Sequence, residues 1–207
     1  MRILVLSPHA DDAELGAGGS IVRFLEEKHE IMWVVFSTAE DSLPPLLPPT
    51  ALKEEFLRVV NYLGIKNYRV YNYKVRRLHV HRQEILEHLV EIRDSYIPDL
   101  VIGPSLNDFH QDHQTVSYEM IRAFKVTASI ICYELPWNHV NFSTQLFIKL
   151  RKSHIDKKIK MLTFYKSQIL KGRKYFDPEF IKGLAKTRGI QCNAEYAEAF
   201  EVVRWIL

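Results

Sequence analysis

The stretch ILVLSPHADDAELGAGGSIV, residues 3–22, carries the clearest indication of the fold. Its first four residues are apolar, a polar turn follows, and a glycine-rich segment comes after the turn. A short apolar run is typical of a strand covered on both faces, and glycines after it allow a helix to pack closely against it. The stretch therefore predicts a first strand, a turn rich in polar side chains, and a first helix.

The same alternation continues along the 207-residue chain. Further apolar or aromatic runs occupy residues 31–36, 68–71, 100–102 and 130–133. Helical patterns lie between them, at residues 54–63 and residues 83–96. This alternation predicts an α/β fold in which residues 1–207 form a single domain with a mostly parallel, Rossmann-like sheet. We expect helices on both faces of the sheet and an active site at the carboxyl edge of the strands.

Two loops and the last part of the chain complete the predicted fold. The loops at residues 38–50 and 135–144 each follow a strand, so we expect them to wall a ligand site. Residues 153–170 predict one helix. Residues 199–205 predict a terminal strand that is added at the edge of the sheet.

The composition excludes several classes of protein. Hydrophobic residues make up 47% of the chain and charged residues 26%, which excludes a disordered or collagen-like protein. The longest apolar run, residues 31–36, is far too short for a membrane-spanning helix, and the first ten residues lack a signal-peptide core. Cys132 and Cys192 have neither metal-binding nor redox spacing. We therefore expect a cytoplasmic protein with two reduced thiols.

The net charge of +3 hides a local excess of basic residues. Residues 149–174 contain ten lysines or arginines and a single acid, Asp156. We interpret this segment first as a surface helix docked by its apolar stripe, second as an anion-binding edge, and last as a membrane-surface helix. No nucleic-acid-binding motif accompanies the charge, so we expect no nucleic-acid partner.

Polar side chains gather directly after the first and fourth predicted strands. The first cluster is HADDAE, residues 9–14, and the second is NDFHQDH, residues 107–113. Either cluster alone is compatible with helix caps and solvated loop residues. If the two strands are neighbours, however, His9, Asp12 and His113 meet at one edge of the sheet. Imidazole and carboxylate ligands suit Zn²⁺ with one position open for water, and the same set suits Fe²⁺ or another divalent metal.

The glycine-rich stretch raises a nucleotide cofactor as an alternative. Gly16 and Gly18 match the first two glycines of G-x-G-x-x-G, but Ile21 stands at the third position. Asp11 and Asp12 would also place negative charge where a pyrophosphate binds. The sequence therefore disfavours a nucleotide-binding oxidoreductase.

Two motifs and the end of the chain resemble one enzyme family. PHADDAELGAGGSI resembles the P-H-P-D-D-E-x-x-G-x-G-G motif of the LmbE-like or PIG-L-like zinc-dependent N-acetylglucosaminyl deacetylases, HQDH resembles their H-x-D-H motif, and AEYAEAFEVVR resembles their carboxyl-terminal strand. The resemblance implies a hydrolase that removes the N-acetyl group of a small 2-acetamido sugar or its conjugate. It also implies the metal ligands His9, Asp12 and His113, the general base Asp11, the oxyanion-facing His110, and Asp112 as a partner that orients a histidine.

The residue types agree with that chemistry. Amide hydrolysis needs an activated water, a Lewis acid on the carbonyl and a proton for the leaving amine. The consecutive carboxylates Asp11 and Asp12 can divide this work, one accepting the proton of the water and the other binding metal. His110, three residues before His113, is expected to stabilise the oxyanion as an imidazolium.

The resemblance is weakest where the family binds its substrate. The arginine that the family often places after the second strand falls near Leu52 or Lys53 here, so Lys53 is the candidate for substrate binding. Ala10 replaces the second proline of the first motif, although the spacing of the ligands is kept. A metal-binding regulatory or interaction module without catalysis is the remaining alternative, and a homo-oligomer is compatible with the sequence.

Overall fold

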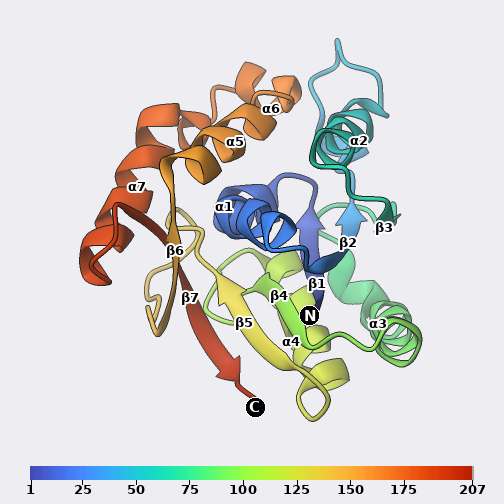
Figure 1. Cartoon of the computed structure of the whole chain (residues 1–207). Helices are drawn as coiled ribbons and strands as arrows, with labels where there is room; N and C mark the ends of the chain where they lie inside the picture. The colour runs from blue at the N-terminus through green and yellow to red at the C-terminus, as the bar shows by residue number, and fades with distance from the viewer. Residues whose placement is uncertain (207) are drawn as a thin grey trace.

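The computed structural model describes residues 1–206, which form a seven-stranded sheet in the order β3-β2-β1-β4-β5-β7-β6 (Figure 1). The strands are β1 (Arg2–His9), β2 (Glu30–Ser37), β3 (Asn67–Val70), β4 (Leu100–Pro104), β5 (Ser129–Tyr133), β6 (Leu146–Leu150) and β7 (Tyr196–Arg204). Strands β1 to β5 pair in parallel, whereas β7 pairs antiparallel with both β5 and β6. The predicted mostly parallel α/β sheet is confirmed.

Helices cover both faces of the sheet. They are α1 (Asp12–Glu26), α2 (Ala51–Leu63), α3 (Arg82–Tyr96), α4 (Gln111–Phe124), α5 (Lys152–Leu162), α6 (Lys166–Leu170) and α7 (Pro178–Gln191), with short 3-10 turns η1 (Glu40–Ser42), η2 (Leu78–His81) and η3 (Lys174–Phe176). In β1, Ile3 and Val5 face the core under α1, α2, α5 and α7, and Leu4 and Leu6 face the core under α3 and α4. Because successive side chains of a strand point to opposite faces, an unbroken apolar run suits this doubly covered position. None of the helices formed by the described residues combines the length and apolar character needed to cross a membrane.

The order of the strands places the two polar clusters side by side. Strand β1 pairs with β2 on one side and with β4 on the other, so the direction of the crossovers reverses at β1 and β4. The carboxyl ends of neighbouring parallel strands share one sheet edge, and the reversal leaves a crevice there. The turn after β1 and the turn after β4 therefore open into the same space.

The terminal strand does not lie where the sequence predicts it. Strand β7 is inserted between β5 and β6, and the edge position belongs to β6, which the sequence analysis missed. The inner position of β7 agrees with its burial, since residues 196–201 are all buried. Strand β6 pairs with β7 across some fifty residues of chain, and only its second half alternates, with the exposed Lys149 between the buried Ile148 and Leu150. Such a long-range pairing leaves no local signal beyond a short alternation.

The single helix predicted for residues 153–170 is also wrong, since the segment forms α5 and α6 with a break at residues 163–165. Tyr165 lies in the break and is fully buried, and its hydroxyl donates a hydrogen bond to Glu14 on α1. The hydrogen bond to α1 fixes the break to the core at this point. The break directs the residues after α6 toward the carboxyl edge of the sheet.

Gly16 lets α1 approach β5, and we expect Gly16→Ala to destabilise the fold by about 1–3 kcal/mol. A Cβ atom at this position would lie 2.5 Å from Cδ2 of Tyr133. That ring cannot move away easily, because it is fully buried and its hydroxyl donates to the carbonyl of Leu6. Urea unfolding measures the change. Gly183→Ala in α7 is the control, since nothing lies within 4 Å of its added Cβ and stability should hold or rise; equal midpoints for the two variants would contradict the packing argument.

Candidate active site

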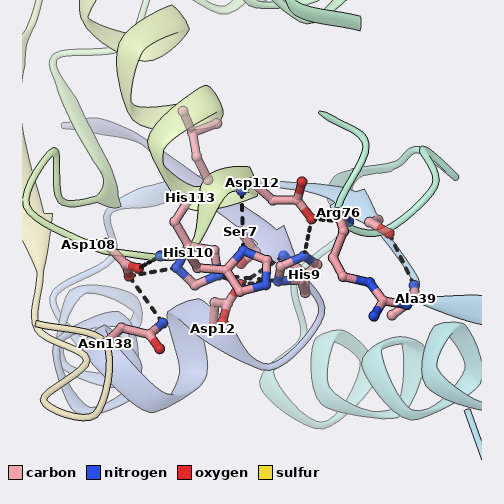
Figure 2. A network of polar contacts seen from close by, with 12 residues as sticks. Ser7, His9, Asp12, Ala39, Arg76, Asp108, His110, Asp112, His113 and Asn138 are labelled. Carbon is pink, nitrogen blue, oxygen red and sulfur yellow. Dashed lines mark hydrogen bonds and ion pairs between the residues drawn. The ribbon is translucent and has the colours of Figure 1, made fainter. Parts of the chain in front are cut away.

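Three acceptor atoms from the two polar turns form a nearly equilateral triangle (Figure 2). Nδ1 of His9 lies 3.2 Å from Oδ2 of Asp12, Nε2 of His113 lies 3.2 Å from the same oxygen, and the two imidazole nitrogens are 3.2 Å apart. His9 ends β1, Asp12 begins α1, and His113 lies in the first turn of α4. The predicted meeting of these residues at the sheet edge is what the structure shows.

The triangle has the dimensions and the chemistry of a metal site. Nitrogen and oxygen ligands about 2.1 Å from a tetrahedral ion lie about 3.4 Å from one another, close to the observed spacing. Two imidazole nitrogens and one carboxylate oxygen are a donor set that Zn²⁺ and Fe²⁺ both accept. His110 also brings a ring nitrogen within 4.8 Å of those of His9 and His113, so it lies beside the triangle as a further donor.

Two buried carboxylates orient the rings of His9 and His113. Oδ2 of Asp112 lies 2.9 Å from Nε2 of His9, and Oδ2 of Asp108 lies 2.7 Å from Nδ1 of His113. A histidine that donates one ring N–H to a carboxylate presents the lone pair of its other nitrogen. The other ring nitrogens, Nδ1 of His9 and Nε2 of His113, therefore face Oδ2 of Asp12 and each other, and they can bind a metal ion once they have lost their protons.

Asp108 is a residue that the sequence analysis missed. Besides its contact with His113, it accepts the backbone N–H of His110 and the side-chain N–H of Asn138. A signal was present, because Asp108 lies within the polar cluster after the fourth predicted strand. Its contact depends on how α4 starts, however, and local sequence does not specify that angle.

Asp11 is the second carboxylate of the turn after β1. It is buried, lines the cavity described below, and has a left-handed backbone with φ of 107°. Its pKa lies well above the ordinary value, because burial disfavours the charged form and the neighbouring carboxylates of Asp12 and Glu14 repel it. A carboxylate in such surroundings binds a proton more readily than one in water.

In the triangle, each pKa shift favours the charged form of the side chain. Burial alone would raise the pKa of Asp12, but the charge and hydrogen bond of His113 hold it well below the usual range. Burial alone would lower the pKa of His113, but Asp12 and Asp108 raise it to about 10. The pKa of His9 is also raised against the effect of burial, chiefly by Asp112. Protons on the two histidines therefore balance the charge of the surrounding carboxylates, and a metal ion at the triangle would compete with those protons.

His110 differs from the imidazolium that the sequence predicts. Burial, followed by the charges of His113 and His9, lowers its pKa to about 4, so the ring is neutral near pH 7. Its Nδ1 accepts the backbone N–H of Asp112, 3.2 Å away, as the cap of α4. The proton of the neutral ring therefore sits on Nε2, which makes His110 a neutral hydrogen-bond donor.

A cavity of about 290 Å³ opens over the triangle. Both predicted loops contribute to it, one through Ala39 and Ser42 and the other through Trp137 and Asn138. The ring of Trp137 stacks on Tyr175, with centroids 4.0 Å apart. An aromatic surface thus lies on the wall of a small polar cavity.

The candidate for substrate binding lies elsewhere. Lys53 is exposed on α2 and is not among the residues that line the cavity, whereas the adjacent Leu52 is. The basic side chains at the cavity are Arg76, Lys171 and Arg173, which the sequence did not single out. Two of them belong to the basic segment at residues 149–174, so part of that segment borders the site.

Solved structures share the whole fold. The N,N'-diacetylchitobiose deacetylase from Pyrococcus horikoshii superposes with a TM-score of 0.81 at 18% identity, covering 98% of this chain and 83% of that one. GalB, the 4-carboxy-2-hydroxymuconate hydratase from Pseudomonas putida KT2440, superposes with a TM-score of 0.80 at 20% identity, covering 100% and 97%. Identities this low establish a common fold and no common reaction.

Sequence comparison is more specific. The uncharacterized deacetylase YaiS of Escherichia coli (strain K12) is 26% identical over 170 residues, which cover 80% of this chain and 90% of that protein. The model of the PIG-L family, described as GlcNAc-PI de-N-acetylase, matches residues 4–124, more than half of the chain and both polar turns. The chain therefore belongs to the PIG-L family of de-N-acetylases.

Proposed function

We propose that the protein is a zinc-dependent deacetylase that hydrolyses the N-acetyl group of a 2-acetamido sugar or its conjugate, releasing acetate and the free amine. One observation carries the proposal: the acceptor triangle opens into a cavity that a further buried carboxylate, Asp11, also lines. A metal-binding module needs the triangle alone, whereas hydrolysis also needs a general base. Membership of a de-N-acetylase family supports the choice of bond.

The residues around the triangle supply the remaining steps. Zn²⁺ bound by His9, Asp12 and His113 would act as a Lewis acid and lower the pKa of a water to about 7. Asp11 accepts the proton of the attacking water and later delivers it to the leaving nitrogen. The Nε2–H of His110 donates a hydrogen bond to the oxygen that gains negative charge. The stacked Trp137 and Tyr175 offer a surface for the apolar face of a sugar ring.

Metal analysis and an amine-release screen test this proposal. The purified protein should contain about one divalent ion per chain, and mass spectrometry of the bound metal distinguishes zinc from iron. Free and conjugated N-acetyl amino sugars are then assayed for released amine, before and after chelation and metal return. Metal binding without hydrolysis of any acetamido sugar would favour the non-catalytic module.

Two other reactions are checked in the same assays. The fold is shared with a hydratase, so loss of an unsaturated carboxylate without amine release would indicate addition of water. A nucleotide-binding oxidoreductase predicts that NAD raises the melting temperature and that chelation does not lower it. The carboxylates after β1 disfavour that outcome, because they occupy the position of a pyrophosphate.

We expect Asp108→Asn to weaken metal binding about 10-fold to 100-fold. The amide keeps the shape of the side chain but accepts the Nδ1–H of His113 more weakly than a carboxylate does. Activity should therefore fall at limiting zinc and recover at saturating zinc. Competition with a chromogenic chelator measures the affinity, and Asp94→Asn on the exposed surface of α3 is the control. A normal affinity with lost activity would mean that Asp108 acts on the substrate instead.

A further inference from the structure

Three basic side chains line the cavity without a carboxylate partner. Arg76 lies between β3 and η2, and Lys171 and Arg173 follow α6. Among residues 1–206, none of the three forms an ion pair. Their only side-chain hydrogen bond runs from Nη2 of Arg76 to Oγ of Ser42, at 3.5 Å. Arg76 and Arg173 are exposed to solvent, and Asp11 and Glu55 attract Lys171 only from beyond ion-pair distance, so all three side chains are available to an anion that enters the cavity.

Two of these basic residues carry a local energetic cost. The pKa of Lys171 is lowered because the side chain is partly buried and because the charge of Arg173 repels it, which together outweigh the attraction of Asp11 and Glu55. Arg76 has a left-handed backbone with φ of 64°, a conformation that residues other than glycine rarely adopt. Strained backbones of this kind concentrate at functional sites. Folding thus accepts repulsion and strain at the residues that place positive charge around the cavity.

Arg76 is tied directly to the reaction site. Its backbone N–H donates to Oδ2 of Asp112 at 2.5 Å, and that oxygen also contacts Nε2 of His9 (Figure 2). The carboxylate that orients a triangle histidine therefore also positions this arginine. On the other segment, Arg173 lies two residues before Tyr175, so one turn supplies both a cation and a member of the aromatic stack.

We propose that Arg76, Lys171 and Arg173 bind an anionic group of the acetylated substrate, a carboxylate or a phosphate, and select acidic conjugates over neutral ones. This inference rests on the proposed deacetylase function. Arginine suits such groups because its planar guanidinium binds two oxygens at once, and lysine adds a point charge. The acids that line the cavity are Asp11 and Asp12, of which Asp11 attracts Lys171. Neither acid forms an ion pair with Arg76 or Arg173, so these guanidinium groups can attract an anion.

Matched substrates test the selectivity. Amine release is measured for N-acetylglucosamine, its 1-phosphate and its 6-phosphate, and for the methyl and carboxymethyl glycosides. At low salt, kcat/KM for a phosphate or carboxymethyl substrate should exceed that of its neutral counterpart about tenfold or more, since hydrogen bonds to charged groups are the strong ones. The preference should shrink at higher salt. Comparison of the phosphate and carboxymethyl substrates identifies which anion is bound. The proposal is overturned if neither acidic substrate has a higher kcat/KM than its neutral counterpart at any salt concentration.

Charge-removing variants assign the preference to residues. Lys171→Gln combined with Arg173→Gln should lower the ratio of acidic to neutral kcat/KM about tenfold. Lys174→Gln is the matched control, because Lys174 is an exposed neighbour that does not line the cavity, and it should keep the ratio. A double variant that slows acidic and neutral substrates equally would mean that the cations act on Asp11, and that result overturns the proposal.

A binding measurement separates this inference from the deacetylase function. Calorimetry compares glucosamine 6-phosphate and 1-phosphate with glucosamine, in the parent protein and in the double variant. If no acetamido sugar is hydrolysed but the parent binds a phosphate better and the variant does not, the reaction is wrong and the anion site stands. If neutral sugars are hydrolysed and no phosphate preference appears in binding or turnover, the reaction stands and the anion site is wrong.

Discussion

The Asp11→Asn variant should lose turnover by about 10² to 10⁴ while it keeps its metal. Asparagine preserves the shape of the side chain but cannot accept the proton of the attacking water. Burial and the charges of Asp12 and Glu14 make the Asp11 carboxylate a stronger base than a solvated one. Steady-state kinetics should show a lower kcat with KM little changed, since the lost interaction acts mainly in the transition state.

The adjacent Asp12→Asn variant provides the contrast. It removes the anionic member of the triangle, so metal affinity should fall first and excess zinc should restore part of the activity. Thermal unfolding of Asp11→Asn should not begin at a lower temperature, because a buried carboxylate that repels its neighbours has been removed. Full recovery of Asp11→Asn in excess zinc would mean that the two aspartates have exchanged roles. Full activity without added metal would contradict the mechanism.

The His113→Ala variant should lose most of its bound zinc. The side chain is 2% exposed, and its Nε2 takes part in two of the three distances that define the triangle. The alanine variant therefore offers no other group in its place to bind the metal. The loss should exceed the 10-fold to 100-fold effect expected of the orienting carboxylate. Metal content after gel filtration measures the outcome, and circular dichroism verifies that the variant is folded.

His110→Ala is the matched control for that experiment. Its ring nitrogen lies near those of the other two histidines but outside the triangle, so the variant should retain zinc and lose turnover. If His110→Ala loses as much zinc as His113→Ala, His110 is itself a metal ligand and its role as a hydrogen-bond donor to the substrate is wrong. If His113→Ala carries as much metal as the parent, the ligand set proposed here is wrong.

Local pattern was sufficient for the parallel part of the sheet. The apolar runs at β1, β2, β4 and β5 are buried on both faces, and such runs are distinctive in a sequence. Polar residues directly after β1 and β4 could be expected to meet, because topology brings the ends of neighbouring parallel strands together. For this reason the triangle was predictable from two short motifs one hundred residues apart.

Long-range packing decided the rest. The inner position of β7, the break before α6 and the contact of Asp108 with His113 depend on partners distant in sequence or on the direction in which a helix leaves its turn. The basic side chains at the cavity could not be predicted for the same reason, since Arg76 and Arg173 are almost one hundred residues apart and lie in irregular segments. Hydrophobic periodicity specifies which face of an element is buried. It does not specify where a loop places a charged side chain, because that position follows from the packing of the elements on either side.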